Sequence, residues 1–122
     1  MTDHAPILVI GAGPGGLAAA VALQRRALPF DIVDAGPSIG GIWDIEREHT
    51  PMYRSAHFIS SKTLSGFADL PMPAEYPDYP RHDRILAYIQ GYARHHGLTE
   101  RVRLNTRVVE ARPTGQDLGE RR

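Results

Sequence analysis

The sequence predicts an α/β fold in which parallel strands form a sheet and helices cover one of its faces. Three observations predict it. Residues 7–10 are apolar at every position, as in a strand buried in the middle of a parallel sheet. The glycine-rich segment GAGPGG follows at once and leads into a helical pattern of apolar residues. A second apolar strand then ends at Asp34, which completes a strand–turn–helix–strand unit.

The first helix is expected from about Pro14 to Ala27. Proline suits the first helical position because its missing N–H leaves no hydrogen bond unmade there. The second strand is expected over residues 30–34, and Gly36-Pro37 ends it. One apolar stripe of the helix is expected to pack on the sheet, and its members are Leu17, Ala20, Val21 and Leu28.

The second half of the chain returns to a regular pattern after a long irregular stretch. Residues 71–80 hold four prolines, which predicts an extended segment rather than a helix or a strand. A second helix is expected to begin with Asp83 as its N-cap and to stop before Gly97. Short strands are expected at residues 102–104 and 106–111. The apolar stripe of the second helix is Ile85, Leu86, Ile89, Tyr92 and Ala93.

Charge and cysteine content exclude several classes of protein. The chain has 14 Lys and Arg against 14 Asp and Glu, so no charge excess indicates nucleic acid or an anionic membrane as a partner. The absence of cysteine excludes disulfides and thiolate metal sites and fits a cytoplasmic protein. No basic and apolar leader opens the sequence, so neither a signal peptide nor a spanning helix is expected. His95 and His96 are adjacent and diverge on a helix, so they predict no metal site.

The segment GAGPGG carries glycines at the G-x-G-x-x-G spacing of dinucleotide-binding loops. Gly11 is expected to allow the tight turn, and Gly13 to leave bare backbone beside a pyrophosphate. Gly16 is expected to let the helix lie close against the strand. Pro14 and Gly15 complete the predicted loop at the helix N-terminus, where free N–H groups and the helix dipole favour an anion.

Asp34 ends the second strand at the position where a carboxylate accepts hydrogen bonds from ribose hydroxyls. A carboxylate there repels a 2′-phosphate, which favours the adenosine half of FAD or NAD over NADP. Together with the strand and helix that flank the glycines, this predicts a partial Rossmann-type domain over residues 1–112. Residues 113–122 contain a single leucine and are predicted to be a disordered tail.

Later segments carry a resemblance to a known family. DAGPSIGGIWD at residues 34–44 places G-G-x-W shortly after the acid, and MYRSAHFISSKTLSGFADLPMP follows at residues 52–73. YPDYPRHDRILAYIQGYARHHGL and VRLNTRVVEA extend the match. Over residues 6–111 the chain resembles the N-terminal FAD-binding region of flavin-containing and Baeyer–Villiger monooxygenases.

The resemblance implies an FAD-binding domain of parallel strands with one flanking helix layer. It implies that Gly40 and Gly41 pass close to the FAD pyrophosphate and ribityl chain, and that Trp43 lies near the flavin. It also implies the family's reaction, in which NAD(P)H reduces the flavin and a C4a-(hydro)peroxyflavin oxygenates a small organic substrate. No residue is assigned a catalytic role, because members related to the animal enzymes often carry an asparagine where this chain has Ile59.

Family enzymes are several times longer than this chain, and the NADPH-binding fingerprint that the resemblance implies does not occur in it. The chain is therefore expected to be a truncated N-terminal part with an incomplete sheet, whose first strand forms an unprotected edge. A complementary C-terminal chain would complete that sheet. Two milder departures are Ala27, where many FAD proteins have glycine, and Asp34 in place of the more frequent glutamate.

Two alternatives stay open: a non-catalytic fragment without stable cofactor binding, and a stand-alone NAD-binding module. A stand-alone NAD-binding module would leave the G-G-x-W and Ser-Ser-Lys elements unexplained. Asp44, Glu46 and Glu48 alternate along the chain, but a paired-carboxylate hydrolase needs a cleft that nothing in the sequence defines, so a solvated loop is expected. Neither G-x-S-x-G nor cysteine supplies a nucleophile.

Overall fold

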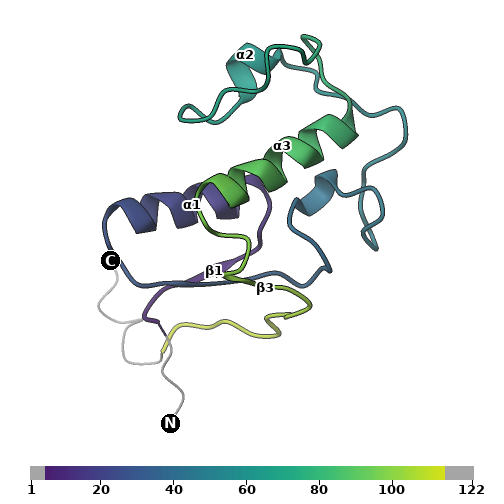
Figure 1. Cartoon of the computed structure of the whole chain (residues 1–122). Helices are drawn as coiled ribbons and strands as arrows, with labels where there is room; N and C mark the ends of the chain where they lie inside the picture. The colour runs from purple at the N-terminus through teal and green to yellow at the C-terminus, as the bar shows by residue number, and fades with distance from the viewer. Residues whose placement is uncertain (1–4, 115–122) are drawn as a thin grey trace.

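The computed structural model describes residues 5–114 and has the predicted strand–turn–helix–strand unit at its start (Figure 1). Residues 115–122 of the predicted tail lie outside the described residues, while 113 and 114 are exposed and irregular. The elements in chain order are β1 (Leu8–Ile10), α1 (Pro14–Arg25), β2 (Asp31–Val33), the 3₁₀ turn η1 (Gly41–Trp43), α2 (Lys62–Ser65), α3 (His82–His95) and β3 (Val102–Arg103).

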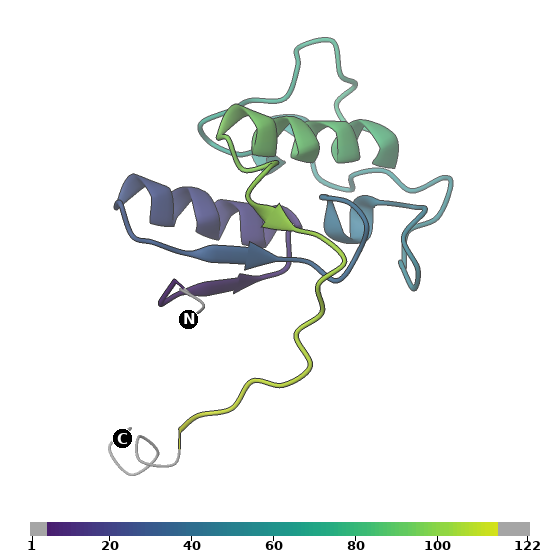
Figure 2. The ribbon, with the colours of Figure 1, turned by 60° about the horizontal axis from the view of Figure 1, so that its bottom comes forward.

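The three strands form one parallel sheet in the order β1-β2-β3. Helices α1 and α3 lie on the same side of this sheet, which confirms the single flanking helix layer (Figure 2). Across the sheet Val9 pairs with Ile32, and Ile32 pairs with Val102. Ile32 and Val102 are buried, so this row of side chains faces the helices.

The other face of the sheet is open at β1. Leu8 and Ile10 are 49% and 59% exposed, although a strand apolar at every position is usually buried on both faces. Within residues 5–114, β1 has a single neighbouring strand, so its second edge is unpaired. The predicted unprotected edge is therefore confirmed in the part of the chain that the structure describes.

Helix α1 ends earlier than predicted. It stops at Arg25, and Ala27 adopts a φ of +55° in a turn where its N–H donates to Gln24 and the N–H of Leu28 donates to Leu23. These two bonds form the helix-ending motif that usually carries glycine at the left-handed position. Leu28 consequently lies outside the helix and is 43% exposed, so its expected place in the apolar stripe was wrong. The remaining stripe members, Leu17, Ala20 and Val21, are buried as predicted.

Helix α3 begins one residue before the predicted N-cap. Arg81 caps it, and Asp83 lies in its first turn, so the capping role expected of Asp83 was wrong. The reason is tertiary: Arg81 forms an antiparallel bridge with His57, and the N–H of His82 donates to Ala56, which holds the chain extended up to this point. The predicted stop holds, with Gly97 at a φ of +68°. Ile85, Ile89, Tyr92 and Ala93 of the predicted stripe are buried.

The strand expected at residues 106–111 does not form, and this is a further correction. The N–H of Asn105 donates to Gly36 and that of Thr106 to Asp34, so the chain is tied to the end of β2 and then leaves the sheet. Val109 is 90% exposed. A strand pair needs a second strand beside it, and the described residues offer none there. No described helix is long and apolar enough to cross a membrane.

Candidate functional site

The glycine loop joins β1 to α1 by close backbone contact. Gly11 has a φ of +103°, and its N–H donates to the carbonyl of Val33 at 2.7 Å. A Cβ on Gly16 would lie 1.8 Å from the carbonyl oxygen of Gly11, so the first turn of the helix rests on the loop backbone. The positive φ of Gly11 and the close contact at Gly16 match the roles that were expected of these two glycines from the sequence.

A second pair of glycines lies against the first loop. The N–H of Gly40 donates to Ala12 at 3.1 Å, and Gly41 has a φ of +62°. A Cβ on Gly41 would lie 3.1 Å from the Cα of Gly13. Two segments that are far apart in the sequence thus bring bare backbone together at the start of α1.

The N-terminus of α1 is uncapped by any side chain of the described residues. Gly13 is the N-cap, Pro14 takes the first helical position as predicted, and no acid stands in the first turn. The space where a Cβ of Gly11 or Gly15 would project is empty to 4 Å. Free N–H groups, the positive end of the helix dipole and room beside the backbone suit a phosphate group at this point.

Asp34 is buried at the end of β2 and bridges two backbone segments. One carboxylate oxygen accepts the N–H of Ala12 at 2.7 Å and the other accepts the N–H of Gly36 at 2.8 Å. Burial alone raises the pKa of Asp34, but the hydrogen bonds from Ala12, Arg47 and Gly36 outweigh it, so the pKa lies below its ordinary value. The carboxylate is therefore ionised at neutral pH and orients the glycine loop.

Arg47 is a residue of this site that sequence reasoning missed. Its Nη2 lies 2.5 Å from an oxygen of Asp34, and the Asp34 side chain is only 3% exposed. Arg47 follows η1 in a stretch of acidic residues, D-I-E-R-E, and a lone base among acids was the signal that could have found it. Arg47 and Asp34 both line a cavity of about 210 Å³, together with Gly11 and Thr106.

Trp43 is half-buried beside the glycine loop. Its ring meets Phe58 edge to face, with 5.1 Å between the ring centroids. Trp43 also lines a small apolar cavity of about 90 Å³ with Pro14 of α1 and Ile89 of α3. The structure thus brings Trp43 to the start of α1, where the other predicted site residues meet.

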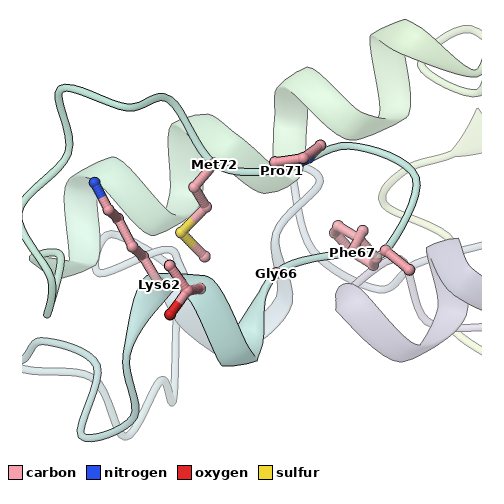
Figure 3. Close-up of a pocket in the computed structure, with 7 residues that line it drawn as sticks. Lys62, Gly66, Phe67, Pro71 and Met72 are labelled. Carbon is pink, nitrogen blue, oxygen red and sulfur yellow. The ribbon is translucent and has the colours of Figure 1, made fainter.

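In the described chain, the lysine of the Ser-Ser-Lys element makes hydrogen bonds that stabilise the fold. Lys62 donates from Nζ to the carbonyls of Ala74 at 2.8 Å and of Tyr76 at 2.5 Å, which fixes the proline-rich segment. Lys62 also lines a cavity of about 240 Å³ with Phe67 and Met72 (Figure 3). Because the Lys62 ammonium is held by backbone carbonyls, this cavity gives no candidate for a catalytic group.

The acidic residues between positions 44 and 48 are not all exposed to solvent. Asp44 is buried, accepts the Ser38 hydroxyl and accepts the N–H of Glu46 at 3.0 Å, so the expected solvation of Asp44 was wrong. Glu48 is 87% exposed and lies 3.3 Å from His49. The described residues hold no group of three or more His, Cys, Asp or Glu side chains arranged for a metal ion.

Comparison with known proteins identifies relatives across the whole unit. The profile of the family described as flavin-binding monooxygenase-like matches residues 5–118. Flavin-containing monooxygenase FMO GS-OX-like 5 of Arabidopsis thaliana is 28% identical over 91% of this chain, which covers 29% of that protein.

Two solved structures share the fold. The flavin-containing monooxygenase from Stenotrophomonas maltophilia is 32% identical with a TM-score of 0.75, over 93% of this chain and 32% of its own. The S-allyl-L-cysteine S-oxygenase from Allium sativum is 28% identical with a TM-score of 0.76, over 84% of this chain and 28% of its own. The chain thus spans about a third or less of the length of these relatives.

Proposed function

The chain belongs to the flavin-binding monooxygenase-like family, and from this membership we propose that it holds the FAD of an NAD(P)H-dependent flavin monooxygenase. The observation that carries the proposal is the meeting of two bare backbone segments, around Gly13 and Gly41, at the uncapped N-terminus of α1. A diphosphate needs close backbone donors and positive potential, and this place offers both.

We assign the FAD pyrophosphate to the backbone of the glycine loop and of the second glycine pair. The residues proposed to contact it are Gly11, Gly13, Pro14, Gly15, Gly16, Gly40 and Gly41. Free N–H groups of the first turn of α1 donate to the phosphate oxygens, and the helix dipole adds to the attraction. The glycines serve by leaving no side chain between the ligand and the backbone.

Asp34 and Trp43 are proposed to hold the two ends of the cofactor. Asp34 is ionised and buried at the end of β2, so it accepts hydrogen bonds from the adenosine ribose. Trp43 lines a small cavity with Pro14 at the start of α1 and would shield one part of the flavin from water. When bound, a reduced flavin supplies the oxygen chemistry that transfers one oxygen atom to a small organic substrate. The residues of this chain bind and orient the cofactor.

The reduction by NAD(P)H and the oxygenation are proposed for the enzyme as a whole. The described unit leaves one edge of β1 and its outer face uncovered, which supports a complementary C-terminal chain as a partner. A cytoplasmic location is proposed from the absence of cysteine. No nucleic acid or membrane partner is proposed, because the formal net charge is +0.

The proposal is tested by titrating the purified chain with FAD while flavin fluorescence and circular dichroism are recorded together. Saturable quenching with ordered helix and strand supports it. Asp34→Asn, which keeps the shape of the side chain, is expected to weaken binding, whereas Asp78→Asn is the matched control. The Asp78 side chain is exposed and makes no hydrogen bond or ion pair within residues 5–114. An ordered chain without quenching favours the non-catalytic fragment, and tighter binding of NAD than of FAD favours the NAD module.

A further inference from the structure

We propose that Arg47 is a binding residue for the ribose hydroxyls on the adenosine side of the ligand, acting as a pair with Asp34. This inference rests on the proposed function, because it concerns the same site. The Nη2 of Arg47 lies 2.5 Å from Oδ1 of Asp34, and the Asp34 side chain is 3% exposed against 21% for Arg47. The two charges cancel, so the pair forms a neutral but strongly polar surface.

A neutral pair of this kind offers both a hydrogen-bond acceptor and a donor to the hydroxyl groups of a diol. Oδ1 of Asp34 already accepts two N–H groups, from Gly36 and Arg47, whereas Oδ2 accepts only the N–H of Ala12. One acceptor position on Oδ2 thus remains for a ligand hydroxyl, since each carboxylate oxygen has two lone pairs. A ribose hydroxyl donates one hydrogen bond and accepts others. It can therefore bind Asp34 as a donor and Arg47 as an acceptor at the same time.

The Arg47 guanidinium lacks one of the acceptors it needs. Its Nη1 is buried and has no hydrogen-bond partner in residues 5–114. A buried N–H donor without an acceptor is costly and rare in folded proteins. An oxygen of the ligand would supply the missing acceptor, and this unmet donor is the observation that points to a ligand.

The Arg47 guanidinium occupies a space that exists because residue 36 is glycine. A Cβ on Gly36 would lie 2.6 Å from Cζ of Arg47 and 2.7 Å from its Nη1, so glycine leaves the room that the side chain fills. The turn that carries Arg47 is fixed as well: its N–H donates to Asp44 at 3.1 Å and its carbonyl accepts from Thr50 at 3.2 Å. Arg47 is thus placed by the structure rather than drawn to Asp34 by charge alone.

Space for a ligand lies on both sides of the pair. Arg47 lines the cavity of about 210 Å³ that also touches Gly11 and Asp34, and a second one of about 320 Å³ beside Gly36. The first cavity begins at the glycine loop, where the diphosphate is proposed to lie. A sugar attached to that diphosphate would therefore reach the Asp34–Arg47 pair.

A phosphate is the competing occupant, because Arg107 also lines both cavities. A 2′-phosphate would gain contacts with Arg47 and Arg107 but would face the ionised Asp34, and Glu46 and Glu48 line the larger cavity. The balance of charge favours an uncharged diol over an anion.

The experiment compares three probes by calorimetry that share the 5′-diphosphate: ADP, 2′-deoxy-ADP and 2′-phospho-ADP. For the unmodified chain, ADP is expected to bind at least about fivefold more tightly than 2′-deoxy-ADP, which lacks one or two hydrogen bonds. ADP is also expected to bind more tightly than 2′-phospho-ADP, whose 2′-phosphate faces the ionised Asp34. Arg47→Met is expected to weaken ADP binding about tenfold and to lower the preference for ADP over 2′-deoxy-ADP, leaving the part that Asp34 contributes. Arg54→Met is the matched control, because the exposed Arg54 side chain makes no hydrogen bond or ion pair among the described residues.

Gly36→Ala is the second variant, because it displaces the guanidinium while it keeps the arginine and its charge. It is expected to reproduce the loss seen with Arg47→Met, with a circular dichroism spectrum like that of the unmodified chain. Equal or tighter ADP binding in both variants would overturn the inference and leave FAD binding standing. Tighter binding of 2′-phospho-ADP than of ADP would overturn it in favour of an anion site. No binding of FAD or ADP by the unmodified chain would overturn the proposed function and this inference together.

Discussion

Gly16 and Gly11 meet through bare backbone, since a Cβ on Gly16 would lie 1.8 Å from the carbonyl oxygen of Gly11. This contact fixes the first turn of α1 against the end of β1. It places the free N–H groups of the helix next to the loop, so the fold and the proposed phosphate site depend on the same two residues.

Gly16→Ala is therefore expected to destabilise the chain by about 2 kcal/mol or more, because neither backbone segment can move aside without breaking the unit. The measurement is the free energy of unfolding in urea. Gly15→Ala is the control: no atom lies within 4 Å of its added Cβ, and alanine favours the helix by about 0.5–1 kcal/mol. Equal effects of the two substitutions would contradict the described contact.

Ala27→Gly is expected to stabilise the chain by about 1 kcal/mol, because Ala27 has a φ of +55° that costs a residue with a side chain. Thermal unfolding followed by circular dichroism gives the change in midpoint. Ala18→Gly, at an exposed position inside α1, should lower stability by about 0.5–1 kcal/mol. A loss of stability with Ala27→Gly would show that the helix does not end in this motif.

Tyr92 makes the stability of the chain sensitive to alkaline pH. Burial, followed by the hydrogen bond to Asp69 at 3.0 Å, raises the pKa of Tyr92 to about 12 from its ordinary value of 10.0. A raised pKa means that the neutral phenol stabilises the folded state fully below pH 10, and that this contribution is lost as the pH rises toward 12. Urea unfolding between pH 8 and pH 12 checks it. Tyr92→Phe should flatten the decline, whereas Tyr79→Phe, at a residue 54% exposed, should leave it unchanged.

Asp69 produces the opposite dependence at acid pH. Burial raises the pKa of Asp69, but hydrogen bonds from Tyr92 and His96 outweigh it and hold the pKa below its ordinary value of 3.8. The carboxylate therefore stabilises the fold above pH 3.8, and the contribution disappears as the pH falls through the lowered pKa. Asp69→Asn should leave a shallower acid unfolding curve than the unmodified chain. An unchanged acid curve would contradict a role for Asp69 in joining its loop to α1 and α3.

The open face of β1 is expected to drive association of the isolated chain. Leu8 is 49% exposed on a strand whose second edge is unpaired within the described residues. Leu8→Lys should reduce association, as measured by light scattering after gel filtration, while stability stays within about 0.5 kcal/mol. Val9→Lys, on the face that packs against α1, should instead unfold the chain. Unchanged association with Leu8→Lys would show that another surface is responsible.

The parts of the fold that could be predicted from sequence are those set by local pattern. The glycine spacing, the proline at the start of α1 and the stop at Gly97 each act within a few residues, and each is found as predicted. The missing strand at 106–111 could not be excluded in this way, because a strand depends on a neighbour far along the chain. Asp83 lost the capping role for a similar reason, since the bridge between His57 and Arg81 decides where α3 begins.

The candidate site divides in the same way. The two glycine motifs are visible in the sequence, but the contact between Gly13 and Gly41 is a finding of the structure that was not predicted. Arg47 was not predicted either, because its ion pair with Asp34 depends on the path of the turn after η1 and on the space left by Gly36. Chain periodicity carries no information about that path.

Gly13→Ala gives the most direct test of the central claim that bare backbone at the start of α1 holds FAD. A Cβ on Gly13 would meet the Cα of Gly41 at an ordinary 3.5 Å, and its φ of −83° suits alanine, so the fold tolerates the change within about 1 kcal/mol. FAD fluorescence quenching of this variant and of the unmodified chain is the measurement. An affinity at least about tenfold lower is expected for Gly13→Ala at nearly unchanged stability, because the added methyl group fills the contact between Gly13 and Gly41 beside which the phosphate is proposed to lie. Equal FAD affinity in the two proteins would contradict the claim.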